Sequence, residues 1–217
     1  MEPGHERIAR IALAAGARYG LALAGGYAVS AHGIGNRPSG DVDLFTSWQH
    51  RSQFPELTAA VVAALEAAGY KASVIMSGET FTRLTLADPA GGTEEKLELS
   101  VDWRAHDPVQ LAVGPVLHAD DAIANKVCAL FGRALPRDFL DVDAAITSGR
   151  YTRGQLLELA AQADHGFDRL LFADALGALT QITDAGFAEY RTDPSMIADM
   201  RHRFAQWRQE LLAAGSG

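Results

Sequence analysis

The pattern of apolar and polar residues changes about halfway along the chain. In the first half, short segments alternate apolar and polar residues as β-strands do, and other segments repeat apolar residues at helical spacing. Strands are predicted at residues 21–24, 42–45, 70–76, 80–86 and 96–101, and helices at 5–19, 27–33 and 52–68. This order of elements predicts a small mixed sheet with helices on one side.

After Pro115 the pattern is helical throughout. Helices are predicted at residues 120–131, 136–147, 153–162, 169–181 and 194–213. Glycine and proline stand between them, and Pro136 suits the first position of its helix. The chain is therefore expected to have an α+β fold, with a core domain at residues 1–115 followed by an all-helical domain at 116–217.

Composition narrows the classes of protein to consider. Of the 217 residues 48% are hydrophobic, which is enough for a packed core. Arg7, Arg10 and Arg18 interrupt the first helix, so neither a membrane span nor a signal peptide is expected. The single cysteine, Cys128, excludes an internal disulfide. These features predict a cytoplasmic protein, and the net charge of −8 argues against broad binding to nucleic acid.

Two short motifs carry the clearest chemistry. Gly25 and Gly26 follow an apolar strand and precede a helix, where backbone N–H groups can approach a phosphate. Asp41 and Asp43 lie one residue apart on a second strand, so both side chains point to the same face. Two adjacent carboxylates repel each other unless a cation lies between them, and Mg²⁺ takes such oxygen ligands together with substrate phosphates. The motifs predict a site for a metal-bound nucleoside triphosphate.

This combination resembles the signature of the polymerase β-like nucleotidyltransferase superfamily. That signature continues with a third acid on a later strand, and the resemblance implies the superfamily's fold, with Mg²⁺ or Mn²⁺ as cofactor. Period-two alternation places Glu98, Ser100 and Asp102 on one face of the strand at 96–101 and just beyond it. We favour Asp102 as the third metal ligand over its rival Glu98, because functional acids tend to lie near strand ends.

A second cluster of charged residues lies in the helical half. Lys126 and Arg133 share one helix face, and Asp138 and Asp141 share another. By themselves these residues favour an interhelical salt-bridge network with ordinary helix capping. The cluster also resembles the downstream motif of the AbiEii/AbiGii toxin branch, and the similarity spans roughly residues 21–145.

The resemblance implies that Lys126 contacts nucleotide phosphates and acts in catalysis, with Asp41, Asp43 and Asp102 holding the metal. The expected nucleotide-binding residues are Gly25, Gly26, Arg37, Ser39, Lys126, Arg133, Arg137, Asp138 and Asp141. In this sequence Gly40 directly precedes Asp41, one departure from the expected pattern.

The sequence thus predicts a magnesium-dependent enzyme that transfers a nucleoside monophosphate from a triphosphate to an acceptor hydroxyl and releases pyrophosphate. The toxin branch implies an RNA or tRNA acceptor, a type IV toxin-antitoxin system and a cognate antitoxin. Basic groups that could follow an RNA backbone are Arg133, Arg137, Arg201 and Arg203. One alternative is a small-molecule transferase of the aminoglycoside type, which shares the Gly-Gly and Asp-x-Asp segments. Another is an inactive nucleotide-binding module.

Overall fold

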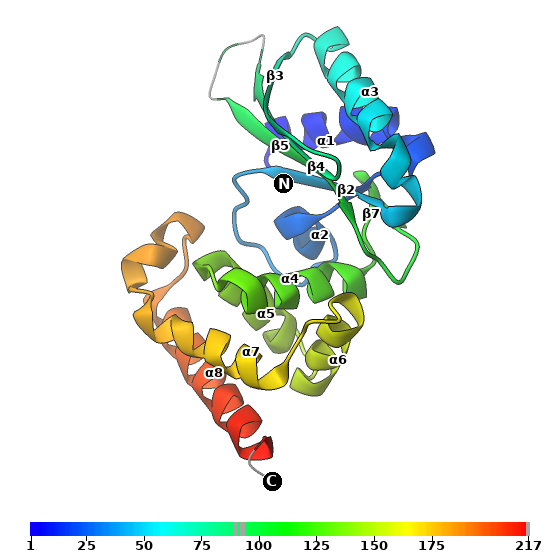
Figure 1. Ribbon diagram of the computed structural model, residues 1–217. Helices are drawn as coiled ribbons and strands as arrows, with labels where there is room; N and C mark the ends of the chain where they lie inside the picture. The colour runs from blue at the N-terminus through cyan, green and yellow to red at the C-terminus, as the bar shows by residue number, and fades with distance from the viewer. Residues whose placement is uncertain (89–90, 92–93, 216–217) are drawn as a thin grey trace. The chain divides into compact units, whose positions relative to one another are not determined.

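The computed structural model describes residues 1–88, 91 and 94–215, which form two compact units (Figure 1). The first unit comprises Met1–Ala31 and Ser39–His118. The second comprises the helical half from Ala119 onward together with His32–Pro38. A short piece of the first half thus belongs with the helices. Among the described residues, no helix combines the length and the apolarity needed to cross a membrane.

A seven-stranded mixed sheet, with strand order β3-β4-β5-β2-β1-β7-β6, is the centre of the first unit. The strands are β1 (Ala22–Leu23), β2 (Val42–Ser47), β3 (Lys71–Ser77), β4 (Phe81–Ala87), β5 (Glu95–Asp102), β6 (Val109–Leu111) and β7 (Gly114–Val116). β2 pairs with β5, and β1 with β7, in parallel, and the other neighbours are antiparallel. The five predicted strands are confirmed. β6 and β7, three residues each, are too short to give a periodic signal.

The alternation of side chains gives this sheet one buried face. Val42, Leu84 and Leu97 form a buried row across β2, β5 and β4, because their backbones are paired in register. The helices α1 (Pro3–Ala15) and α3 (Phe54–Ala67) contact each other, and each also packs against a strand of the sheet (Figure 1). Short 3-10 helices occupy Ala17–Tyr19 and Trp48–Gln53, and α2 occupies Gly25–Ala31. The opposite face is only partly buried, and it carries the polar residues.

The second unit consists of helices packed around aromatic side chains. Its helices are α4 (Ala119–Arg133), α5 (Pro136–Thr147), α6 (Arg153–Ala163), α7 (Arg169–Gly177) and α8 (Pro194–Ala214), with 3-10 turns at Ala178–Gln181 and Asp184–Tyr190. Phe139, Phe172, Phe204 and Trp207 are buried in its core and meet at ring-centroid distances of 5.2–6.0 Å. The predicted helices are confirmed, except that the α-helical part of the fourth ends at Gly177.

Candidate active site

The Gly-Gly turn lies directly against the second acid of the Asp-x-Asp pair. Gly25 begins α2 with a φ of 59°, a conformation that side-chain-bearing residues rarely adopt. A Cβ atom added to Gly25 would lie 1.8 Å from Oδ2 of Asp43. The backbone N–H of the preceding Ala24 donates a hydrogen bond to the Asp43 carbonyl oxygen at 2.8 Å. Position 25 therefore requires glycine for both its conformation and its contact with Asp43.

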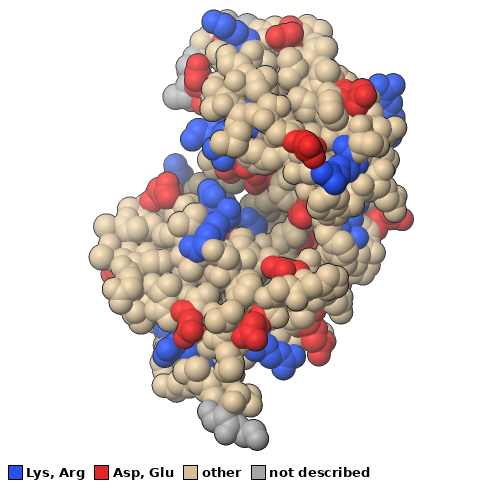
Figure 2. Space-filling view, viewed as in Figure 1, with Lys and Arg blue, Asp and Glu red and all other residues tan. Residues whose placement is uncertain are grey.

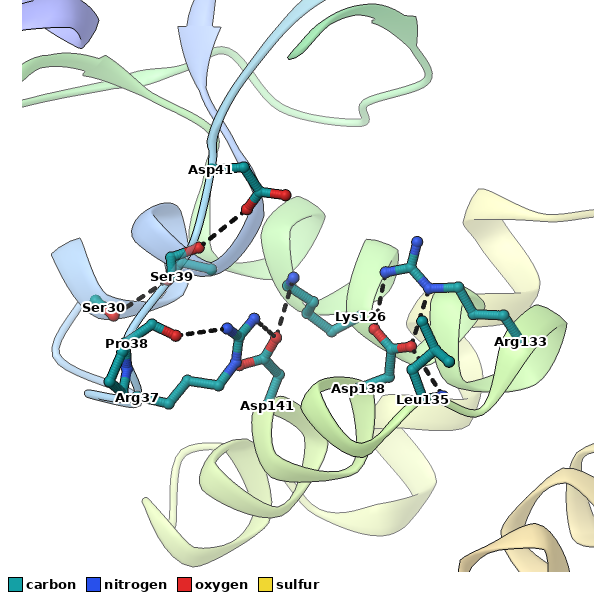
Figure 3. Close-up of polar contacts among 11 residues, drawn as sticks. Ser30, Arg37, Pro38, Ser39, Asp41, Lys126, Arg133, Leu135, Asp138 and Asp141 are labelled. Carbon is teal, nitrogen blue, oxygen red and sulfur yellow. Dashed lines mark hydrogen bonds and ion pairs between the residues drawn. The ribbon is translucent and has the colours of Figure 1, made fainter. Parts of the chain in front are cut away.

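The first acid is held by the hydroxyl that precedes it. Asp41 comes directly before β2 and is half-buried, as Asp43 is. Ser39 is only 8% exposed, and its Oγ donates to Oδ1 of Asp41 at 3.3 Å (Figure 3). The structure thus brings Ser39, Asp41, Asp43 and Gly25 together within the first unit. The Ser39 hydroxyl, one of the expected nucleotide contacts, donates its hydrogen to the Asp41 carboxylate.

The strand register favours Glu98 over Asp102 as the third carboxylate. Asp43 on β2 is paired directly with Glu98 on β5, whereas Asp102 is paired with Ser47. The separation of four positions between Glu98 and Asp102 corresponds to about 13 Å along a strand. Asp102 Oδ1 instead accepts a hydrogen bond from the backbone N–H of Trp103 at 2.8 Å. The register therefore places Glu98, and not Asp102, directly beside Asp43.

Glu98 has a cationic neighbour on its other side. Arg83 on β4 is paired with Glu98 in register, and its Nε and Nη2 lie 2.8 and 2.7 Å from Oε1 of Glu98. Three adjacent strands therefore present the row Asp43, Glu98 and Arg83 on the partly buried face. One arginine beside two carboxylates reduces their mutual repulsion and holds Glu98 in place.

A buried ion cluster forms the centre of the polar residues in the second unit. Asp141 on α5 is 3% exposed and Lys126 on α4 is 7% exposed. Lys126 Nζ lies 3.0 Å from Oδ2 of Asp141. Nε and Nη2 of Arg37 donate to the two oxygens of the same carboxylate, each at 2.7 Å (Figure 3). Two cations on one carboxylate leave the cluster with one net positive charge.

These contacts determine the protonation of the cluster. Burial acts to raise the pKa of Asp141, but the charges and hydrogen bonds of Lys126 and Arg37 outweigh it and hold that pKa below its ordinary value. Burial acts to lower the pKa of Arg37, and the hydrogen bond and charge of Asp141 outweigh it, so the pKa is raised. Asp141 is therefore a carboxylate and Arg37 a cation at neutral pH.

A second ion pair joins the end of α4 to the start of α5. Asp138 is fully buried, and Nε and Nη2 of Arg133 donate to its two oxygens, each at 2.9 Å. Oδ2 of Asp138 also accepts the backbone N–H of Leu135 at 3.2 Å (Figure 3). The salt-bridge network that the residues alone favoured is confirmed for both Lys126 and Arg133.

The arginines that were expected to follow an RNA backbone have acidic partners as well. Arg201 Nη1 lies 2.6 Å from Oδ1 of Asp184. Arg203 donates from Nε and Nη2 to the two oxygens of Asp143, each at 2.8 Å. On the face that Figure 2 shows, acidic and basic side chains are interspersed. Much of this positive charge is therefore balanced locally.

Comparison with known proteins bears on the whole length of the chain. The model of the family "Nucleotidyl transferase AbiEii toxin, Type IV TA system" matches residues 8–214. No protein of curated function matches the sequence.

Solved structures share the fold at low sequence identity. The crystal structure of JHP933 from Helicobacter pylori is 17% identical, with a TM-score of 0.58, over 98% of this chain and 94% of that one. The solution structure of the antibiotic-resistance factor ANT(2'')-Ia is 18% identical, with a TM-score of 0.50, over 83% of this chain and 97% of that one. The fold is that of the polymerase β-like nucleotidyltransferases, and the chain belongs to the AbiEii nucleotidyltransferase toxin family.

Proposed function

We propose that this nucleotidyltransferase uses Asp41, Asp43 and Glu98 to hold Mg²⁺ while it transfers a nucleoside monophosphate from a triphosphate to an RNA hydroxyl. The observation that carries the proposal is the paired register of Asp43 with Glu98 beside the Gly-Gly turn. Asp102, four residues farther along β5, is not a ligand in the proposed metal site.

The donor set suits a hard divalent cation. Three carboxylates on one strand face offer the oxygen ligands that Mg²⁺ and Mn²⁺ accept. Such a cation would neutralise charge on the triphosphate and on the leaving pyrophosphate. Gly25 and Gly26 would bind phosphate oxygens through backbone N–H groups at the start of α2. Arg83 would hold Glu98 in one orientation and moderate the repulsion between the acids when the cation is absent.

In the second unit, Lys126 is the proposed phosphate contact. Its contact with Asp141 would fix the long lysine side chain, so that less conformational entropy is lost on binding. Arg37 would share Asp141 and contribute to the cluster's net positive charge. Arg133 and Asp138 would hold the α4–α5 turn that sets the relative positions of Lys126 and Asp141.

RNA is the proposed acceptor, because the matched family is one of type IV toxins, and a cognate antitoxin follows from the same source. A small-molecule hydroxyl is the second candidate. The fold shared with ANT(2'')-Ia and the local pairing of Arg133, Arg201 and Arg203 favour it.

The test is an incubation of the protein with Mg²⁺, total cellular RNA and each labelled triphosphate in turn, followed by a denaturing gel. Label should enter RNA with one or more triphosphates, and Asp43→Asn should abolish the transfer while the protein remains folded. Asp102→Asn is the matched control, and it should retain activity. Drug resistance on expression, without a labelled RNA product, would replace RNA with a small molecule as acceptor. Full activity of Asp43→Asn would remove the proposed site.

A further inference from the structure

A buried hydrogen-bond chain links the start of α1 to the segment that carries Asp41. His5 is 5% exposed, and its Nδ1 lies 2.5 Å from the hydroxyl of Tyr27 on α2. Its Nε2 lies 2.7 Å from Oε2 of Glu95, the first residue of β5. The Tyr27 hydroxyl in turn donates to the backbone carbonyl of Ser39 at 3.2 Å. All four residues, and Asp41, belong to the first unit.

The hydrogens available on the side chains determine which group donates in these hydrogen bonds. A tyrosine hydroxyl has a single hydrogen, and here it is donated to Ser39, so the contact between His5 and Tyr27 must use a hydrogen on Nδ1. The Glu95 carboxylate accepts the hydrogen on Nε2. The two ring nitrogens of His5 thus connect the Tyr27 hydroxyl to the Glu95 carboxylate. Burial raises the pKa of Tyr27 above its ordinary value, so its hydroxyl keeps the hydrogen that Ser39 accepts.

The segment that receives this hydrogen bond is held by contacts of its side chains and backbone: Arg37 bonds to Asp141 within the second unit, and Ser39 bonds to Tyr27 within the first. Residues 35–39 have no regular secondary structure, and His32–Pro38 pack with the second unit. Ser39 is the point at which the chain returns to the first unit. The next residue, Gly40, is exposed, and an added Cβ there would meet nothing within 4 Å. A segment without regular secondary structure loses conformational entropy when Asp41 must adopt one position.

We propose that His5, Tyr27 and Glu95 are positioning residues that hold the Ser39 backbone, and thereby Asp41, in the geometry that binds the divalent cation. Ser39 completes the link, since its hydroxyl donates to Oδ1 of Asp41. This inference rests on the proposed function, in which Asp41 is a metal ligand. It adds residues far from the Asp-x-Asp motif that act only through the backbone of residue 39.

The experiment titrates the full-length protein with Mn²⁺ alone and follows free Mn²⁺ by electron paramagnetic resonance, so neither nucleotide nor acceptor needs to be known. Tyr27→Phe removes one hydrogen bond, worth about 1 kcal/mol, and should raise the Kd for Mn²⁺ about fivefold. His5→Leu should have a similar effect. His5→Asn keeps a donor at the position of Nδ1, and it should bind Mn²⁺ more tightly than His5→Leu does.

Two further variants separate the possible outcomes. Tyr70→Phe, at a tyrosine that is 3% exposed elsewhere in the first unit, controls for the loss of a tyrosine hydroxyl. Its Kd for Mn²⁺ should equal that of the wild type, whatever happens to its melting temperature. Asp41→Asn should weaken Mn²⁺ binding far more than Tyr27→Phe does.

If Asp41→Asn loses Mn²⁺ while folded Tyr27→Phe and His5→Leu bind it as the wild type does, the positioning role is refuted and the metal site stands. If Asp41→Asn binds Mn²⁺ normally, the proposed metal site itself is refuted. Should Tyr27→Phe fail to fold, the comparison of His5→Leu with His5→Asn decides, since equal Kd values for these two would overturn the inference.

Discussion

Replacing Gly25 with alanine tests whether the Gly-Gly turn positions the acid beside it. An alanine Cβ at this position would lie 1.8 Å from Oδ2 of Asp43, 2.6 Å from Cγ and 2.8 Å from Cβ, and ordinary contact begins at 3.4 Å. The Asp43 carboxylate would therefore have to move by about 1.6 Å. A misplacement of about 1 Å at a catalytic group can lower the rate by about 10²-fold.

The same substitution also strains the backbone. A left-handed conformation costs a residue other than glycine about 1–2 kcal/mol. Gly33 supplies the matched control, because its φ of 67° is similar and an added Cβ there would meet nothing within 4 Å. Gly33→Ala should therefore lose about 1–2 kcal/mol of unfolding free energy and keep its activity.

Gly25→Ala should lose at least as much stability as Gly33→Ala and, in addition, about 10²-fold or more in the rate of labelled-nucleotide transfer at saturating Mg²⁺. Urea denaturation followed by circular dichroism measures the first quantity, and the gel assay measures the second. Equal transfer rates for the two alanine variants would show that the contact of Gly25 with Asp43 has no part in the reaction.

Other predictions concern the third acid and the buried cluster. Glu98→Gln should lower the transfer rate by several powers of ten, with a melting temperature close to that of the wild type, whereas Asp102→Asn should keep nearly the wild-type rate. A large loss of rate in Asp102→Asn together with an active Glu98→Gln would instead make Asp102 the third metal ligand. Lys126→Ala should lower the transfer rate by about 10²-fold. Because Arg37 still pairs with Asp141 in this variant, Lys126→Ala should lose less unfolding free energy than Asp141→Asn does. An unchanged transfer rate would leave Lys126 a purely structural role. Asp141→Asn should cost about 3–5 kcal/mol of unfolding free energy at pH 7, because two buried cations lose their carboxylate. The pKa of Asp141 is lowered in the folded state, so the stability that the carboxylate contributes is complete above its ordinary pKa of 3.8 and is lost as the pH falls below that value. The unfolding free energies of wild type and Asp141→Asn should therefore converge in acid and stay apart above about pH 5.

The sequence by itself determined the features that depend on neighbours along the chain. Alternation with period two placed Asp41 and Asp43 on one face, and helical spacing located the helices of the second half. Both signals are local, because a strand or a helix fixes where the side chains of nearby residues point. The family resemblance depended on the same local motifs, and the match over residues 8–214 bears it out.

Only the tertiary structure decided which distant residues meet. The pairing of β2 with β5 places Glu98, and not Asp102, beside Asp43, although the sequence gives both acids the same face. The contact of Arg37 with Asp141 joins residues 104 positions apart and has no periodic signal. Register and long-range ion pairs follow from how buried rows such as Val42 and Leu97 pack against each other, and this packing depends on the whole core at once.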